Sequence, residues 1–480
     1  MASNPAAVLS KYHETFGDTF RLYLGGLKEA IVTIDPAVIQ HVLKTNAENY
    51  QKSEIQVKRM GHFLGKGLLT THGEAWRTQR RLIQTGFKEL GMLSKIMQDS
   101  LAESLRDFDR QIRVGPVDVY SHFMKMTFAM VARSLFGARL KDEDIDLVSQ
   151  TICTVQEFIV RQTLQPYLNP WFAASGELRK HEDRRTRADA VLLEYIRKRR
   201  HEPPGHDLLQ TLIDARYSDG EGMSDELVLS ESMQLLVAGH ETSSNALSWL
   251  LYLLSTHPDC LDRVRQEFCS VLGEAPLSYA DVLKFEFTTQ VIYEGLRLYP
   301  PFWMIDRMAV ADDRVGDMVI LRGSMIIVYV YGAHHAPRYW QNPENFDPER
   351  FTKEEMKLRT PFTFLPFGGG PRVCIGQHYA MLQILMILSD LIRRYDFELV
   401  PGQTIEARPM VILRPKHGIR MTFTNTTVPV VRQNLKPRAS LTARDDPRHG
   451  KGFAQQLLIA AHRAGLFENR AEGSTNRVET

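Results

Sequence analysis

Residues Phe367 to Gly376 have the glycine-rich sequence FGGGPRVCIG. The stretch holds four glycines, a proline and one cysteine, and the run HYAMLQILMILSDLIRRY that follows has the apolar spacing of a helix. Glycine lets the backbone approach a ligand closely or adopt a positive φ angle. A thiol just ahead of a helix lies near unpaired amide groups, which favour negative charge and lower the pKa of cysteine. We therefore expect Cys374 to act as a thiolate.

Three uses of a thiolate at Cys374 compete: a nucleophile, a zinc ligand and an axial ligand to haem iron. Zinc needs further cysteine or histidine ligands at short spacing, and the chain has no C-x-x-C or H-x-x-x-H companion. A nucleophile needs a histidine base, which any of 16 histidines could supply, so the residues alone leave this use open. Cys153, Cys260 and Cys269 are expected to be small buried apolar side chains.

The composition is that of a folded globular protein. With 480 residues, 43% hydrophobic and 24% charged, the chain can bury an ordinary core, and a net charge of +2 does not indicate nucleic-acid binding. No apolar run reaches the ~18 residues of a membrane-spanning helix, and the N-terminus lacks the pattern of a secretory signal. Four scattered cysteines do not make a disulfide framework, so we expect a cytoplasmic protein without a membrane anchor.

Hydrophobic periodicity predicts a mainly α-helical chain with small β-sheets. A hairpin is expected over 18–35, and loops over 197–207 and 217–226. After residue 427 the sequence is polar and basic, so 427–480 is expected to be a flexible extension with one short helix over 452–467. Further helices are predicted over 36–46, 76–110, 118–136, 143–166, 183–200, 224–256, 258–272 and 287–298, and strands over 318–331 and 404–424.

Five residues of the opening stretch match a known signature. Phe367, Gly370, Arg372, Cys374 and Gly376 agree, position for position, with the haem-binding motif F-x-x-G-x-R-x-C-x-G. The chain therefore resembles the cytochrome P450 superfamily of haem-thiolate monooxygenases. The resemblance implies haem b as the cofactor, Cys374 as the ligand of its iron, and Phe367 and Arg372 as cofactor-binding residues.

The resemblance extends over most of the chain, because other motifs of the family follow in its order. It implies a single haem-thiolate monooxygenase fold over residues 1–426, an α-rich prism with a β-rich subregion. The chain begins almost inside the family's first helix, which is typical of a soluble bacterial-type member or of a truncated start.

Glu294 and Arg297, in EGLRLYPP, fit the family motif E-x-x-R. On a helix they lie on one face, and alone they would be an ordinary ion pair worth about 0.2–0.5 kcal/mol. The motif PERF, with Arg350, follows where the family places it. The resemblance therefore implies a buried network of Glu294, Arg297 and Arg350 that supports the cysteine loop.

The motif AGHETS, residues 238–243, resembles A/G-G-x-D/E-T-T/S in the family's central helix. By pattern alone its polar residues would be the exposed face of an amphipathic helix. The resemblance implies catalytic roles instead: Thr242 donates a hydrogen bond to iron-bound dioxygen, and Glu241 helps to relay protons from solvent. Gly239 weakens the helix by about 1 kcal/mol and is expected to permit a kink or a side groove.

WRTQRRL, residues 76–82, matches the family's W-x-x-x-R helix. Trp76 and Arg80 lie one turn apart on one face, where the resemblance implies that they meet the haem propionates. Arg307 and Arg372 are expected to bind propionates too, because guanidinium groups pair well with carboxylates.

Positions that line the substrate pocket in relatives carry apolar and aromatic residues here, which implies a lipophilic substrate such as a fatty acid, terpenoid or steroid. Lys58 and Arg59 are an alternative anchor for a substrate carboxylate, but solvated surface charges are the commoner case. The pocket positions are Val237, Ala238, Phe302, Trp303, Met304, Met410, Val411 and Ile412, with the segments 55–68 and 158–172, which include Trp171 and Phe172.

The function implied is the insertion of one oxygen atom from O2 into a lipophilic substrate, with electrons from a separate ferredoxin or flavodoxin-type protein. The basic residues Arg77, Arg81 and Lys88 are the expected docking cluster for that acidic partner. Two alternatives are a peroxygenase or isomerase, against which the Glu241 and Thr242 pair argues, and a non-enzymatic haem sensor, for which no output domain is visible.

Overall fold

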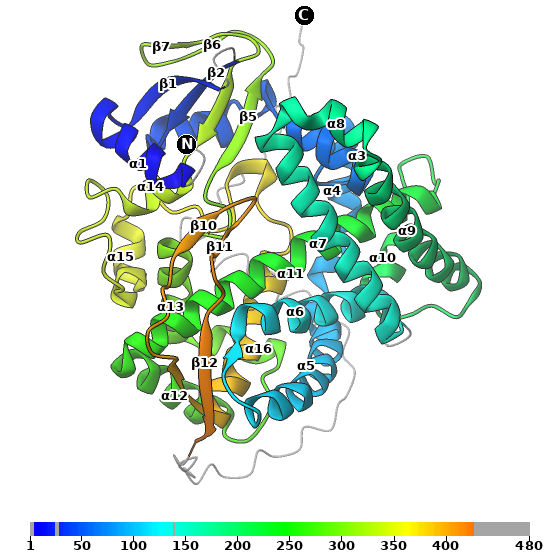
Figure 1. Cartoon of the computed structure of the whole chain (residues 1–480), viewed down its shortest axis with the longest axis vertical. Helices are drawn as coiled ribbons and strands as arrows, with labels where there is room; N and C mark the ends of the chain where they lie inside the picture. Colours follow the sequence, from blue (N-terminus) through cyan, green and yellow to red (C-terminus); the bar gives the residue numbers. More distant parts are fainter. Residues whose placement is uncertain (1–3, 25–27, 138–139, 427–480) are drawn as a thin grey trace, which may run out of the picture.

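The computed structural model describes residues 4–24, 28–137 and 140–426, and it is built mainly from helices (Figure 1). The fold class predicted from the sequence is confirmed. The expected extension 427–480 and its helix lie outside the described residues, so that boundary stays a prediction. Among the described residues, no helix combines the length and apolarity needed to cross a membrane.

The longer helices agree closely with the predicted periodic runs. They are α4 (Gly73–Gln84), α5 (Leu90–Ile112), α6 (Val119–Phe136), α7 (Asp142–Leu164), α9 (Glu177–His201), α11 (Asp225–Thr256), α12 (Pro258–Leu272), α13 (Glu286–Leu298) and α16 (Gln377–Arg394). Shorter ones are α1 (Pro5–Phe16), α2 (Pro36–Gln40), α3 (Gly61–Leu64), α8 (Asn169–Ala174), α10 (Leu208–Asp214), α14 (Val330–His335) and α15 (Lys353–Leu358), and η1 (His41–Thr45) and η3 (Ile55–Met60) are π-helical.

Four small sheets complete the described fold. The largest has the order β1-β2-β8-β5-β3, in which only β2 and β8 are parallel, and it lies with α1 and α14 at one end of the molecule (Figure 1). The predicted hairpin is confirmed, because β1 pairs antiparallel with β2. The strands are β1 (Thr19–Leu24), β2 (Lys28–Thr33), β3 (Tyr50–Gln51), β4 (Val117–Asp118), β5 (Ile305–Ala309), β6 (Asp313–Val315), β7 (Met318–Ile320), β8 (Met325–Val328), β9 (Tyr395–Leu399), β10 (Ala407–Pro409), β11 (Leu413–Pro415) and β12 (Arg420–Asn425).

The central element is α11, which runs through the middle of the molecule and contacts α6, α9, α13 and α16 (Figure 1). Ser224 caps its start by accepting a hydrogen bond from the amide of Leu227. α11 continues through Gly239 without a break in its helical assignment, so the expectation that this glycine permits a kink or a side groove stays a prediction. A Cβ on Gly239 would lie 3.0 Å from Val131 on α6, so this glycine lets the two helices pack closely.

Two predicted boundaries were wrong. The loop expected over 197–207 begins only after His201, because α9 continues through the basic run and its buried Arg199 pairs with Asp207 at 2.7 Å. Basic residues in a last helical turn are also favoured by the helix dipole. The single run expected over 76–110 is two helices, separated at Gly86, where a Cβ would lie 3.0 Å from Leu208 on α10.

Candidate functional site

The cysteine loop is held in shape by close backbone packing. The amide of Cys374 donates to the carbonyl of Phe367 at 2.9 Å, and residues 370–372 form a single 3-10 turn. Gly370 has φ +67°, and a Cβ there would lie 1.7 Å from the carbonyl oxygen of Leu43 in η1. Glycine is therefore required at this position on two grounds, its backbone conformation and the contact with η1.

The Cys374 side chain is exposed on one side and densely surrounded by protein on the others. Burial raises the pKa of the thiol, and the opposing effects of the Gly376 amide and of Arg80 are smaller. The expectation that the loop alone lowers the pKa of Cys374 was therefore wrong, because desolvation of the thiolate outweighs the amides ahead of α16. A metal cation bound to the sulfur would supply the missing stabilisation of the thiolate.

The zinc alternative gains no support from the structure. Across the part of the chain that the structure describes, no group of three or more histidine, cysteine, aspartate or glutamate side chains is placed to hold a metal ion. A structural zinc site needs four such ligands, and a catalytic one needs three.

Positive side chains gather beside the cysteine loop without carboxylate partners of their own. Arg80 donates to the carbonyl of Val373 at 2.8 Å, and Arg307 donates to the carbonyl of Asp306 at 2.8 Å. Arg372 donates to the carbonyl of Thr71 and stacks on Trp76, with the guanidinium 4.1 Å from the ring centroid. All three arginines lie near one another, and the groups that accept their hydrogen bonds are neutral backbone carbonyls.

The electrostatic cost of this arrangement appears in the pKa values. Burial, together with the charges of Arg307, Arg77 and Arg80, lowers the pKa of Arg372 to about 9. Burial also lowers the pKa values of Arg80 and Arg307. An anion bound among these charges would favour their charged forms and offset the cost of burying them. A ligand with acidic groups therefore fits beside Cys374.

Lys52 belongs to the same cluster and was missed in the sequence. It follows β3, and its ammonium donates to the carbonyl of Leu69 at 2.5 Å. Burial lowers its pKa to about 7, and the nearby charges of Arg372 and Arg307 add to the effect. No local pattern could have indicated this residue, because a lone lysine after a short strand is usually a surface charge.

The residues of the E-x-x-R motif form a fully buried ion pair. Glu294 and Arg297 are 0% exposed, and their two contacts measure 2.6 and 2.8 Å. Arg350 adds a third charge, with Nε 3.4 Å from Glu294 Oε1, and the amide of Asp347 donates to the same carboxylate at 2.9 Å. The three predicted network residues are thus brought together, and the pair is unlike an exposed ion pair on a helix surface.

His334 links this network to the cysteine loop, and it is a second residue that sequence reasoning missed. Arg297 Nη1 donates to the carbonyl of His334 at 2.8 Å, and His334 Nε2 accepts a 2.8 Å bond from the amide of Leu365. His334 Nδ1 therefore carries the proton and donates to the carbonyl of Arg297 at 3.2 Å. Burial lowers the pKa of His334 far below its usual value, which keeps the ring neutral in this role.

The motif AGHETS includes most of the half-buried residues in the central part of α11. Between Glu231 and Leu251 every residue is buried except Leu235, Ala238, Gly239, Glu241 and Thr242, which are half-buried. Thr242 Oγ1 donates to the carbonyl of Ala238 at 2.9 Å, which leaves its oxygen lone pairs free to accept. The partly open side of the helix therefore coincides with the predicted catalytic residues.

Glu241 is held in a polar setting within the protein. Its Oε2 accepts a 3.0 Å bond from Gln156 on α7. Burial raises the pKa of Glu241, while the charge of Arg414 on β11 and the bond from Gln156 partly oppose the shift. A carboxyl with a raised pKa binds a proton more readily than an exposed one, as a proton-relay group requires.

The predicted pocket residues fall into two groups. Phe302 and Val411 are 51% and 38% exposed, and Ala238 is half-buried, so they stay candidates for a substrate wall. Trp303 is different, because it lies in the core beneath the largest sheet and its indole donates to the carbonyl of Met410 at 2.9 Å. The structure thus gives Trp303 a structural role that joins the segments around 303 and 410.

Trp171 and Met304 are 54% and 37% exposed and also stay candidates, whereas other predicted pocket residues are engaged by other parts of the fold. Val237 is buried, and Phe172 packs in a separate small core with Phe158. Lys58 pairs with Glu54 at 2.9 Å, and Arg59 donates to the carbonyl of Gln162 at 2.7 Å. These contacts disfavour Lys58 and Arg59 as anchors for a substrate carboxylate.

Comparison with known proteins agrees with this site. The model of the cytochrome P450 family matches residues 1–423. One relative is the protein LUTEIN DEFICIENT 5, chloroplastic, from Arabidopsis thaliana, 28% identical over 454 residues that cover 90% of this chain and 76% of the relative. Another is the cyclooctat-9-en-7-ol 5-monooxygenase of Streptomyces melanosporofaciens, 29% identical over 81% of this chain and 84% of the relative.

Among solved structures, the retinoic acid-bound cyanobacterial CYP120A1 is similar with a TM-score of 0.77 and 27% identity, over 87% of this chain and 93% of that one. The chain belongs to the cytochrome P450 family and is an oxygen-incorporating oxidoreductase. Membership implies a haem cofactor, and the residues present fit one. The exposed thiol of Cys374 suits an iron ligand, and the cluster of Lys52, Arg307 and Arg372 suits the two propionate groups.

Replacing His334 with leucine is expected to destabilise the protein by about 1–3 kcal/mol, because the buried amide of Leu365 loses its acceptor. The midpoint of urea denaturation measures the effect. His334→Gln should recover part of the loss, since its side-chain oxygen can accept the same bond. His378→Leu, at an exposed histidine near the same loop, serves as the control. A His334→Leu protein as stable as the parent would remove this residue from the support of the loop.

Proposed function

We propose that this protein is a haem b-dependent monooxygenase that inserts one atom of O2 into a lipophilic substrate, using electrons from a separate redox protein in the cytoplasm. One observation carries the proposal: an exposed thiol on a glycine-rich loop lies beside a cluster of cations in which the charge of Asp306 acts on Lys52 and Arg307 but no ion pair forms among the described residues. Cys374 would bind the iron, and Arg80, Arg307, Arg372 and Lys52 would hold the propionates. When bound, the haem supplies the activation of oxygen, which the thiolate assists electronically.

The rest of the binding site follows from the loop geometry. Trp76 would hold the Arg372 guanidinium toward the propionates by stacking on it, as the 4.1 Å contact supports. Phe367 would fix the loop, since its carbonyl accepts the amide of Cys374. The buried pair of Glu294 and Arg297, with Arg350, would support the same loop from behind.

Oxygen activation consumes protons, and α11 offers a route for them. The Thr242 hydroxyl donates a hydrogen bond to the carbonyl of Ala238, so its oxygen is free to accept a hydrogen bond from a proton donor. Glu241 lies one residue earlier, and its raised pKa suits a group that takes up a proton and passes it on. Gln156 and the charge of Arg414 would hold its carboxyl in place between transfers.

A lipophilic substrate is supported by the apolar side chains near the open side of α11 and by what the relatives are named for. Phe302, Val411 and Ala238 are apolar side chains that are not fully buried, so they are available to contact such a substrate. One relative is named as a monooxygenase of cyclooctat-9-en-7-ol, and one similar structure holds retinoic acid. We infer a substrate of the terpenoid, fatty acid or steroid class.

The docking surface for the redox protein is inferred from exposed cations around the loop. Phe87 packs against Gly376 and Tyr379, so η4 (Gly86–Lys88) places the exposed Lys88 next to the cysteine loop. Arg81 is also exposed. Arg77, the third member of the predicted cluster, contacts Glu48 and Glu74 at 3.0 and 3.3 Å and so contributes less net charge.

Thr242→Ala is expected to retain haem but to uncouple electron consumption from product formation, because the hydroxyl that takes part in proton delivery is lost. The measurement is the ratio of product formed to electrons consumed, with peroxide assayed in parallel, on the fastest substrate from a panel of fatty acids, terpenoids and steroids. We expect a several-fold lower ratio and new peroxide release. Thr256→Ala, at the far end of the same helix, should behave like the parent. Unchanged coupling in Thr242→Ala would remove Thr242 from the mechanism.

Charge reversal at Arg81 and Lys88 is expected to slow electron transfer from an acidic ferredoxin or flavodoxin by about 5- to 10-fold at low ionic strength, and the difference should shrink as salt screens the charges. Stopped-flow reduction over a salt series measures it. Arg322→Glu, at an exposed residue between β7 and β8, is the control. Reduction rates that do not depend on salt or on Arg81 and Lys88 would contradict this docking surface.

A further inference from the structure

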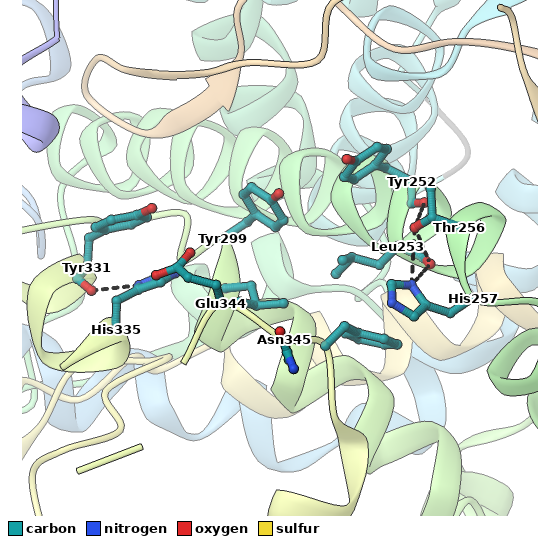
Figure 2. A pocket seen from close by; sticks show the side chains of 11 residues that line it. Tyr252, Leu253, Thr256, His257, Tyr299, Tyr331, His335, Glu344 and Asn345 are labelled. Atoms are coloured by element: carbon teal, nitrogen blue, oxygen red, sulfur yellow. Dashed lines mark hydrogen bonds between the residues drawn. The ribbon is translucent and has the colours of Figure 1, made fainter. Parts of the chain in front are cut away.

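A pocket of about 390 Å³ opens at a part of the fold that the haem chemistry does not use. It is formed where the ends of α11 and α13 meet α14 and the loop that contains Glu344, Asn345 and Phe346. None of the residues assigned above to haem, oxygen or substrate lines it. In Figure 2 the rings of Tyr331 and His335 lie at one end and Tyr252 and His257 at the other, with Tyr299 and Glu344 between them.

Six of the eleven residues that line the pocket carry aromatic rings, and most of the lining surface is contributed by polar atoms. Tyr252 and Tyr299 meet edge to face, with centroids 6.3 Å apart, and Tyr299 is fixed from behind by stacking on Trp249 at 3.8 Å. Tyr331 stacks on His335 at 4.0 Å. Rings held by such contacts present rigid faces and edges to a ligand, so little ordering of side chains accompanies binding.

The charge of the pocket is negative. Burial raises the pKa values of Tyr299 and Tyr331, and the exposed Glu344 carboxylate adds to both shifts, which places it close to both rings. No lysine or arginine lines the pocket in the described part of the chain. Burial lowers the pKa of His335 to about 4, so this ring is neutral at physiological pH.

The buried Arg297 lies close enough to affect Tyr331, but it is paired with another residue. Arg297 lies behind Tyr331 and acts to lower the pKa of that tyrosine, but its side chain contacts Glu294 at 2.6 and 2.8 Å. Within the described residues, no ion pair or hydrogen bond engages the Glu344 carboxylate. Its charge is therefore available to a ligand.

We propose that this pocket binds a small organic cation, an ammonium group carried on an aromatic or short alkyl body. The rings of Tyr252, Tyr299 and Tyr331 would contact the cation through their electron-rich faces, and Glu344 would neutralise it. A bare divalent metal suits the site poorly, because calcium needs about six to eight oxygen ligands and the pocket has one carboxylate. An anion would find no positive partner. The volume lies at the lower end of the range for ligand pockets, so the body of the ligand is small.

The test uses the haem-loaded protein and trimethylphenylammonium, a permanent cation, with binding measured by isothermal titration calorimetry. Its neutral isostere, tert-butylbenzene, is the competitor. We expect the ammonium compound to bind with 1:1 stoichiometry and the isostere not to displace it. Absence of binding, or displacement by the isostere, would overturn the proposal, because it would mean that charge is not what the pocket recognises.

Matched variants assign the binding to this pocket. Glu344→Gln should weaken binding about 5-fold, as expected for a partly exposed ion pair, and Tyr331→Leu should weaken it by a similar factor. Glu354→Gln, at another exposed carboxylate on α15, should leave it unchanged. Both changes at Glu344 and Glu354 keep side-chain size, so folding is not expected to suffer.

Binding that is insensitive to Glu344→Gln would place the cation elsewhere and overturn the proposal. The inference does not depend on the proposed oxygen chemistry. Thr242→Ala should bind trimethylphenylammonium as the parent does, so a failure of the monooxygenase proposal and a failure of this one give different results.

Discussion

The cysteine loop depends on one buried ion pair, between Glu294 and Arg297. Both side chains are 0% exposed, so their charges are taken fully out of water and must satisfy each other. Removing one partner of such a pair typically costs about 3–5 kcal/mol, because the other is left as an uncompensated buried charge. The pair is also a junction: Arg297 reaches the carbonyl of His334, and His334 accepts from Leu365 just ahead of the loop. The position of Cys374 thus depends on a series of short hydrogen bonds that runs from the ion pair through His334 to Leu365.

The positive charges on the two sides of the cysteine loop have different kinds of partner. Glu294 neutralises the arginines behind the loop, whereas Lys52, Arg307 and Arg372 are left with backbone carbonyls as partners. A protein that only needed to fold would gain by pairing or removing these cations, since burial lowers the pKa of each. Their unpaired state makes sense as a preformed site for a dianion.

Local patterns in the sequence predicted the helices, the hairpin and the motif residues, because each is defined by neighbours along the chain. Glu294 and Arg297 are one turn apart, and Gly370 and Cys374 share one loop. His334 and Lys52 could not be predicted, because each acts through a backbone group that is far away in sequence, Leu365 for one and Leu69 for the other. Trp303 was expected to line a substrate pocket because its position does so in relatives, but only the fold shows that it lies in the core. The pKa of Cys374 was misjudged for the same reason, since burial cannot be read from a motif.

The most direct test of the account is the absorption difference spectrum of the dithionite-reduced protein with and without carbon monoxide, recorded alongside Cys374→His. We predict a strongly red-shifted Soret band in the parent protein and its loss in the variant. That result would establish a thiolate-bound haem with an open position for oxygen. An imidazole-like band in the parent, or no bound haem, would contradict the assignment of Cys374 and of the cation cluster around it.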